Sequence, residues 1–374
     1  MSLFVQGVGA VSPLGPNAAT TWAQLLAGNE APRKPLRNGV TGREYYYVPV
    51  PEKFIAEAGR HPRLRRSGTL SLMGAAAAYD ALADAGFQPE VQLGARCAVV
   101  YAICSGGVNY SRRFYHELVT QGANAASPML FPETVFNAPA SHLAALLKLD
   151  GQSYTLVGDS AVGLSAIHFA AQLLTHQSEL ELCVVVGTEE VDWILSDAFN
   201  SWRMATRNSD FEVFGKLSGT ILGEGAAAVV LGRTNGIPLV RTGPGSTFFS
   251  RQDALVAARQ VIQPMIQEET PDCVISSANG TFIDQIEGRV LQELLPATLV
   301  YSYKPALGDA LGASSLFQTV FAALALRNQT VPGTRRGGHR LPSLARESRT
   351  MKLRRALVTV IGFSQQVNSL LLGT

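Results

Sequence analysis

Two segments of the chain have the period of a helix and are apolar on nearly every face. They read AVGLSAIHFAAQLL, from residue 161 to 174, and LGASSLFQTVFAALAL, from residue 311 to 326. A helix without a polar face is normally enclosed between other layers of structure, because it has nothing to present to water. One such segment falls in residues 1–235 and the other in residues 236–374, which suggests an internal duplication with two buried helices.

Short apolar runs that are typical of strands alternate with segments of helical period. The expected strands are 3–11, 97–103, 153–158, 182–187, 226–232, 273–278 and 356–363, and the expected helices are 17–27, 68–86, 134–147, 162–176, 252–266, 284–294 and 309–327. Such alternation favours an α/β layered fold. Two stretches rich in proline, glycine and charge, 29–54 and 233–246, are expected to be irregular. The second is the expected junction between an N-terminal half, 1–235, and a C-terminal half, 236–374.

The composition is that of a globular protein with a large core. Of the 374 residues, 47% are hydrophobic and 16% are charged, and the formal net charge is only +2. So small an excess of positive charge creates no field that would attract nucleic acid or an anionic membrane. The basic stretch at 335–355 contains no aromatic residue that could stack on bases, so we interpret it as a solvated loop.

The four cysteines, Cys97, Cys104, Cys183 and Cys273, are scattered without the spacing of a metal site, and three of them stand in apolar strand-like runs. We interpret them as buried thiols in a reducing compartment. The N-terminus lacks the basic segment and apolar run of an export signal, and no later segment reaches the roughly 18 apolar residues of a membrane span. The sequence therefore predicts a cytoplasmic protein without membrane insertion, metal or cofactor.

Seven motifs occur along the chain in a recognisable order. They are VQGVGAVSPLG (5–15), ASPMLFPETVFNAPASHLAALLKLDGQSYTLVGDS (126–160), LGEGAAAVVLGR (222–233), SANGT (277–281), LGDALGA (307–313), LALRNQTVPGT (324–334) and VIGFSQQVNSLLL (360–372). Together they resemble the β-ketoacyl synthases of the thiolase fold, and the resemblance covers nearly the whole chain.

This resemblance implies a five-layered αβαβα sandwich of two duplicated halves, in which the two apolar segments are the central helices. Active members of the family are dimers. They use a cysteine nucleophile at the N-terminus of the first central helix and two histidines, from an HGT motif and a GHLxGAAG motif. The cysteine takes an acyl chain from an acyl carrier protein, and the histidines assist malonyl decarboxylation and carbon–carbon bond formation.

All three catalytic positions of the family are changed in this sequence. The motifs carry the cysteine position to Ser160, the first histidine to Asn279 and the second to Asp309. Lys304 matches the family pattern, and we interpret it as a remnant ion-pairing residue. The phenylalanine that gates the pocket becomes Ile361, and the glycine-rich motif after it becomes GFSQQVN. The scaffold motifs are kept while the chemical ones are lost.

Ser160 stands where a strand pattern passes into a helix pattern, a position that directs helix N–H groups at developing negative charge. A serine hydroxyl needs a positioned base, but an amide at Asn279 accepts no proton and a carboxylate at Asp309 is a poor base unless burial raises its pKa. His168 lies about 12 Å further along the same helix at 1.5 Å per residue. The sequence GDSAVG also lacks the glycine that an α/β-hydrolase elbow places two residues after its serine.

Within the family, loss of the catalytic residues on a kept scaffold resembles the chain-length factors of type II polyketide synthases, and among these the partner subunit of aryl-polyene pigment synthases. The resemblance implies two partners, an active β-ketoacyl synthase and an acyl carrier protein. It places the following residues at the chain tunnel or the subunit interface: Met129, Leu130, Phe131, Thr134, Phe136, Ile361 and Phe363.

Two alternatives stay open. One is an acyltransferase or thioesterase on the thiolase fold that uses Ser160 as its nucleophile. The other is a free-standing binding protein for acyl chains or carrier proteins.

Overall fold

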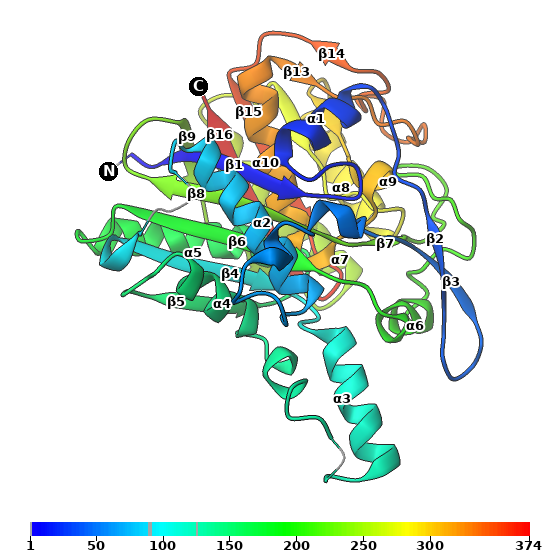
Figure 1. Ribbon diagram of the computed structural model, residues 1–374. Coiled ribbons are helices and arrows are strands. Elements are labelled where there is room, and N and C mark those ends of the chain that lie inside the picture. Colours follow the sequence, from blue (N-terminus) through cyan, green and yellow to red (C-terminus); the bar gives the residue numbers. More distant parts are fainter. Residues whose placement is uncertain (1, 89–91, 125) are drawn as a thin grey trace.

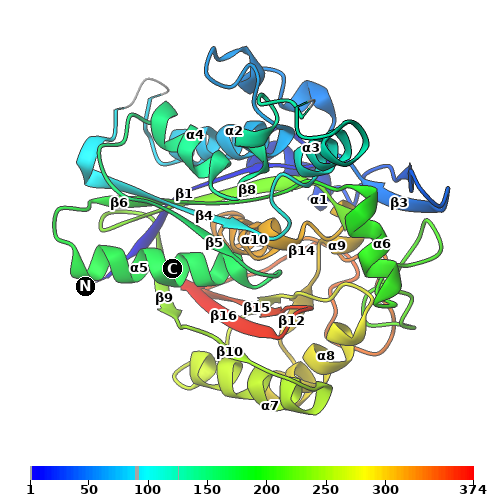
Figure 2. The same cartoon turned by 90° about the horizontal axis from the view of Figure 1, so that it is seen from below.

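The computed structural model describes residues 2–88, 92–124 and 126–374. In Figure 2, helices and strands alternate in five layers, with α2 and α4 at one outer face and α7 and α8 at the other. Two groups of strands lie inside these outer helices, and α5 and α10 lie between the strands. The predicted five-layered α/β sandwich is therefore present.

The main strands follow one hydrogen-bonded path in the order β12-β11-β15-β16-β9-β1-β8-β6-β4-β5, with β10 beside β16. β1 pairs antiparallel with both β8 and β9, and so joins the strands of the two groups. β4 pairs parallel with both β5 and β6. The bounds of these strands are β1 Phe4–Val11, β4 Cys97–Ile103, β5 Ser153–Val157, β6 Leu182–Glu189, β8 Gly225–Gly232, β9 Ile237–Thr242, β10 Ser246–Thr247, β11 Cys273–Ile275, β12 Leu299–Tyr301, β15 Arg355–Ile361 and β16 Gln366–Gly373.

The helices complete the layers. α2 packs on β1 and β8, α10 packs on β8 from the other side and also on β15, and α7 packs on β16. The bounds of the helices are α1 Ala18–Leu26, α2 Thr69–Asp84, α3 Val108–Gln121, α4 Ala138–Leu146, α5 Val162–His176, α6 Trp193–Ser201, α7 Arg251–Ile262, α8 Phe282–Leu294, α9 Lys304–Leu307 and α10 Ser314–Asn328.

The two apolar segments differ in how completely they are enclosed. In α10 every residue from Ser314 to Leu326 is buried, and the side-chain amide of Gln318 donates to the carbonyl oxygens of Ile275 and Thr359, both at 2.9 Å. α5 packs on β4 and β6 and also on α10 and β16, while His168 and Phe169 are half-buried. Both apolar segments therefore lie between layers as expected, but burial is complete only in α10.

Several elements were not expected from the apolar pattern. The stretch 29–54, expected to be irregular, contains the hairpin β2 (Lys34–Arg37) and β3 (Glu44–Val48), which continues to β7 (Leu222–Gly223). The expected junction at 233–246 contains β9 and β10, whose pairing partners are distant in sequence. α3 was not among the expected helices, and none of its residues is buried. A second small pairing joins β13 (Thr330–Val331) to β14 (Arg349–Thr350).

Two further expectations concern the burial of the cysteines and the presence of a membrane-spanning helix. Cys97, Cys183 and Cys273 are buried, Cys104 is half-buried, and all four are free thiols. Burial raises the pKa of the Cys183 thiol to about 12, so this group stays protonated at neutral pH. In the part of the chain that the structure describes, no helix has both the length and the hydropathy needed to cross a membrane.

We predict that Phe321→Ala lowers the free energy of unfolding by about 3–5 kcal/mol, because it empties space in the fully buried α10. The ring of Phe321 packs on the rings of Trp22, Tyr303 and Phe317, at centroid distances of 6.1, 5.1 and 5.8 Å. Urea unfolding followed by circular dichroism measures the change. Phe249→Ala is the matched control, since Phe249 is 81% exposed. Equal losses for the two variants would contradict this role of α10.

Candidate functional site

Ser160 lies in the turn between β5 and α5, as predicted. Its side chain is 1% exposed, and its Oγ has no hydrogen-bond partner among the described residues. The neighbouring Asp159 accepts a hydrogen bond from the N–H of Ala161 at 2.9 Å, so its carboxylate holds the turn directly before α5. The position has the architecture of a nucleophile site, but the hydroxyl of Ser160 is not oriented by any base.

The side chains of Asn279 and Asp309 are in direct contact. The Asn279 side-chain amide donates to Asp309 Oδ2 at 2.8 Å, and Lys304 Nζ donates to the same oxygen at 3.1 Å. The hydroxyl of Ser314, the first residue of α10, donates to the other oxygen of Asp309 at 2.6 Å. Lys304 also donates to the carbonyl oxygen of Ser277 at 2.9 Å. The two positions that the motifs align with the family's histidines are thus joined in one network, and Lys304 forms an ion pair with Asp309, as expected.

The charge of this network follows from its contacts. Burial alone would raise the pKa of Asp309, but the Lys304 ammonium and the hydrogen bonds from Asn279 and Ser314 together hold this pKa below its usual value. Asp309 and Lys304 are both completely buried. A carboxylate held ionised by a buried cation has little affinity for a further proton, so Asp309 is a poor base.

The GFSQQVN segment lies over the beginning of α5. Asp159 accepts hydrogen bonds from the N–H of Ser364 at 2.9 Å and from its hydroxyl at 3.2 Å. A Cβ atom added at Gly362 would lie 2.0 Å from an oxygen of Asp159, so only glycine allows this approach. Ile361 is fully buried, and its N–H donates to Ser277 Oγ at 3.0 Å. The segment and Asp159 together restrict access to Ser160.

Phe363, in the same segment, belongs to an aromatic cluster. Its ring lies 5.1 Å from the ring of Phe199 and 6.1 Å from that of Trp202, measured between centroids. Ile361 lies beside Ser277 and packs into the core, whereas Phe363 contacts the rings of Phe199 and Trp202. A place for either residue at a chain tunnel stays a prediction.

The other predicted tunnel residues lie on a separate part of the molecule. Helix α3 and the 3-10 turn η4 (Phe131–Thr134) pack on each other and form an arm, residues 108–124 and 126–136, whose helix projects from the body in Figure 1. On this arm Met129, Phe131 and Phe136 are 57%, 56% and 42% exposed, whereas Leu130 is buried and Thr134 is half-buried. The structure thus divides the predicted set into a group beside Ser277 and a group on the arm.

A buried carboxylate that the sequence reasoning missed anchors this arm. Glu133, in η4, accepts hydrogen bonds from the N–H of Gly68 at 3.0 Å and from His142 Nε2 at 2.7 Å. Gly68 precedes α2 and has no side chain with which to cap that helix. The carboxylate of Glu133 therefore occupies the place of an N-cap and interacts with the positive end of the α2 dipole. The one signal in the sequence is a charged residue inside the apolar run MLFPETVF.

Two more buried carboxylates join distant segments. Glu189, at the end of β6, accepts hydrogen bonds from the N–H of Ser105 at 3.2 Å and from that of Gly312 at 3.1 Å, and burial raises its pKa to about 7. Glu224 accepts from the N–H groups of Val50 and Val191, which agrees with the structural role expected for it. Among the residues with described positions, no cluster of His, Cys, Asp and Glu could hold a metal ion.

Comparison with known families agrees with this geometry. The family model "Beta-ketoacyl synthase, N-terminal domain" matches residues 2–235, and the model "Beta-ketoacyl synthase, C-terminal domain" matches residues 249–337. The chain belongs to the β-ketoacyl synthase family. The resemblance inferred from the motifs is confirmed, while the assignment of Ser160, Asn279 and Asp309 to the family's catalytic positions stays a prediction.

Two curated relatives of this family member span almost all of it. The 3-oxoacyl-[acyl-carrier-protein] synthase 2 of Coxiella burnetii is 24% identical, over 99% of this chain and 98% of the relative. The tetracenomycin polyketide synthase ketoacyl synthase beta subunit of Streptomyces glaucescens is 25% identical, over 96% and 95%.

Two solved structures have the same fold. "The ishigamide ketosynthase/chain length factor" superposes with a TM-score of 0.87 at 20% identity, covering 100% of this chain and 99% of its own. The ketosynthase ApeO in complex with its chain length factor ApeC from Xenorhabdus doucetiae gives a TM-score of 0.82 at 17% identity, covering 100% and 98%.

We predict that Asp309→Asn destabilises the protein by about 3–5 kcal/mol, because it leaves the buried ammonium of Lys304 without a counter-charge. Adding Lys304→Met to this variant restores part of the loss, since the unpaired cation is then gone. Urea unfolding of the four proteins of this double-mutant cycle measures the coupling. A loss below about 1 kcal/mol for Asp309→Asn, as is usual for exposed pairs, would contradict the assignment.

We predict that Glu133→Gln destabilises the arm and lowers the free energy of unfolding by about 1–2 kcal/mol, because the neutral amide caps α2 less well. The pKa of Glu133 is lowered: burial opposes this, but the contacts with His142 and Gly68 outweigh it. The difference from the wild type is therefore complete above the ordinary carboxyl pKa and shrinks as the pH falls below it. Urea unfolding at several pH values, with limited proteolysis of the arm, measures this.

Glu293→Gln is the control for that experiment, because it breaks the ion pair between Glu293 and Arg259, which are 45% and 34% exposed. It should cost less than about 1 kcal/mol. If Glu133→Gln behaves like Glu293→Gln at every pH, Glu133 does not anchor the arm.

Proposed function

We propose that this chain is a non-catalytic subunit that pairs with an active β-ketoacyl synthase and shapes the tunnel for the growing chain in carrier-protein-dependent polyketide or polyene biosynthesis. One observation carries the proposal. Asp309 is held as an anion by Lys304, Asn279 and Ser314, so Ser160 Oγ has no base among the described residues.

Acyl transfer needs a nucleophile whose proton can be removed. A serine without such a base remains a neutral hydroxyl near pH 7. Asn279 replaces a proton donor and acceptor by an amide, and its oxygen is already used, since it accepts from the hydroxyl of Thr281 at 2.6 Å. The network of Asn279, Lys304 and Asp309 is therefore suited to holding segments of the chain together, and we assign the acyl-transfer reaction to the partner subunit.

The exposed apolar surface supports the presence of a partner. Tyr115 and Val119 on α3 are 59% and 81% exposed, and Phe131 on η4 is 56% exposed. β5 ends the strand path, and its Val157 is 55% exposed. Soluble monomers avoid such unpaired apolar edges, and larger exposed apolar patches mark interfaces between proteins. A second subunit that covers the arm and β5 would bury these side chains.

The names of two structural relatives indicate what kind of protein the proposed partner is. One is described as a ketosynthase/chain length factor and the other as a ketosynthase in complex with its chain length factor. A third solved structure, at a TM-score of 0.82, is described as an acyl-carrier protein in complex with its ketosynthase. By analogy with these names, the partner of this chain is an active ketosynthase, and the proposal assigns Phe131, Thr134 and Phe136 on the arm to the wall of the chain tunnel, where side-chain size would limit chain length.

A thioesterase or acyltransferase that uses Ser160 is the alternative. The unpartnered Oγ at the beginning of α5 favours it, because helix N–H groups could stabilise an oxyanion there. This function would need a base that moves next to Ser160 when an acyl group binds.

The deciding experiment is reconstitution with the active ketosynthase and its carrier protein, followed by mass spectrometry of the products. We predict that Ser160→Ala leaves turnover unchanged, whereas loss of a true nucleophile would cost about 10⁶-fold. We predict that Thr134→Phe shortens the products, because the larger ring fills space at the subunit boundary. Val256→Phe, a bulky change at a 46% exposed position on α7, is the control and should not change product length.

Abolished turnover in Ser160→Ala together with unchanged product length in Thr134→Phe would show that the alternative is correct. Hydrolysis of acyl thioesters by the chain alone, lost in Ser160→Ala, would lead to the same conclusion.

A further inference from the structure

Helix α3 projects from the body without burying any of its residues (Figure 1). The direction of a helix is usually fixed by the packing of an apolar face, and an isolated helix of this length is only marginally stable in water. Since α3 has no buried face, polar contacts at its base must fix its direction.

Two buried carboxylates that directly follow β6 bind the first two turns of α3. Glu190 Oε1 accepts a hydrogen bond from the N–H of Asn109 at 3.1 Å, and Asp192 Oδ2 accepts one from Arg112 Nε at 2.7 Å. Gly107, the N-cap residue of α3, has no side chain with which to cap it, so Glu190 takes this place at the positive end of the helix dipole. Glu190 and Asp192 are only 2% and 3% exposed, so the base of α3 is tied to rigid parts of the body.

Asp192 holds two helices at once. Its Oδ1 accepts from the N–H of Ile194 at 3.0 Å and caps α6, while its Oδ2 binds Arg112. The first contact fixes the carboxylate, so Arg112 meets a partner whose position is set. Burial, and to a smaller extent the carboxylates of Asp192 and Glu133, raise the pKa of Glu190. Negative charge therefore gathers at the base of the arm, and Arg112 brings a positive charge to it.

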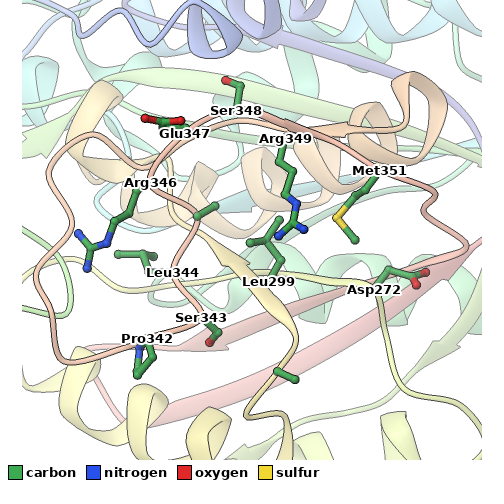
Figure 3. A pocket seen from close by; sticks show the side chains of 12 residues that line it. Asp272, Leu299, Pro342, Ser343, Leu344, Arg346, Glu347, Ser348, Arg349 and Met351 are labelled. Carbon is green, nitrogen blue, oxygen red and sulfur yellow. The ribbon is translucent and has the colours of Figure 1, made fainter.

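This ion pair differs from the exposed charges elsewhere on the molecule. A groove of about 730 Å³ in the C-terminal half is lined by Asp272, Arg346, Glu347 and Arg349 (Figure 3), and the last three are exposed. Exposed charges of both signs are screened by water and salt, so they hold side chains in place only weakly. Arg112 instead binds a carboxylate that is almost completely buried, which makes the contact stronger and more directional.

The position of α3 determines where the proposed tunnel wall lies. Phe114, two residues after Arg112, packs its ring on that of Phe131 at a centroid distance of 5.6 Å. Phe131 begins η4 and Thr134 ends it. A shift of α3 would therefore move the side chains that are assigned above to the wall of the tunnel.

We propose that Arg112 and Asp192 are positioning residues, which hold the arm in one orientation and thereby narrow the range of product lengths. The inference rests on the proposed function, because it concerns the same tunnel wall. The two residues act through Phe114 and Phe131, without touching the growing chain themselves.

The test uses the purified complex with the ketosynthase, reconstituted with its carrier protein, and compares Arg112→Met, Asp192→Asn and the double variant. Asn is as good an N-cap as Asp, so α6 keeps its cap in Asp192→Asn. The ratio of the main product to its shorter and longer neighbours should fall about threefold in each single variant, as is typical of the loss of one partly exposed ion pair. The double variant should be no worse, since both changes remove the same contact. Mass spectrometry at equal concentrations of complex measures the ratio.

Hydrogen exchange of α3 in the complex gives a second readout, which does not depend on any product. The amides of α3 should exchange faster in Arg112→Met, because the base of the helix opens more often. Arg112→Lys keeps the positive charge and should preserve both the product ratio and the slow exchange. Arg96→Met is the matched control and should change neither, because Arg96 pairs with Glu181 outside the arm, where their side chains are 47% and 62% exposed.

Unchanged exchange of α3 in Arg112→Met would overturn the inference. An unchanged product ratio in that variant would also overturn it, and a simultaneous loss of turnover would show that the pair serves stability alone. Equal effects in Arg96→Met would show that the contact with Asp192 has no special role. Failure of the proposed function is recognised separately, because Thr134→Phe would then leave product length unchanged, whereas the exchange of α3 would still report on the ion pair.

Discussion

The enclosure of α10 between two groups of strands is the constraint on which the rest of the structure depends. A helix with thirteen consecutive buried residues, Ser314 to Leu326, cannot exist without a layer on each side. Enclosure also fixes where the helix begins, and Asp309, Ser314 and Gly312 all lie at that end. The carboxylate of Glu189 accepts from the N–H of Gly312 at 3.1 Å and so ties the end of β6 to the turn before α10.

A buried ion pair with two hydrogen-bonded neighbours lies beside the beginning of α10. Asp309 accepts from Lys304, Asn279 and Ser314, so neither the carboxylate nor the ammonium is left unpaired. Such a pair can be buried only because its polar atoms find partners.

Much of the fold could be predicted because strands and helices that are buried on all sides are continuous apolar runs in the sequence. The strands around Cys97, Leu182 and Gly225 and the helix around Phe321 are continuous apolar runs, and their positions agree closely with the structure. α3 and the hairpin β2–β3 contain no such run, since the residues of α3 are not buried and β3 depends on pairing with the distant β7. For the same reason Ser160, Asn279 and Asp309 were found through their motifs, whereas Glu133 was missed, because a helix cap supplied by a residue 65 positions away leaves no local pattern.

The hydrogen bond between Asp159 and Ser364 joins two residues that lie 205 positions apart in the chain. Through this one carboxylate, the loop after β15 is tied to the turn before α5, and Gly362 leaves room for it. A substitution at Asp159 would therefore loosen both segments at once, so the surroundings of Ser160 depend on residues from both ends of the chain.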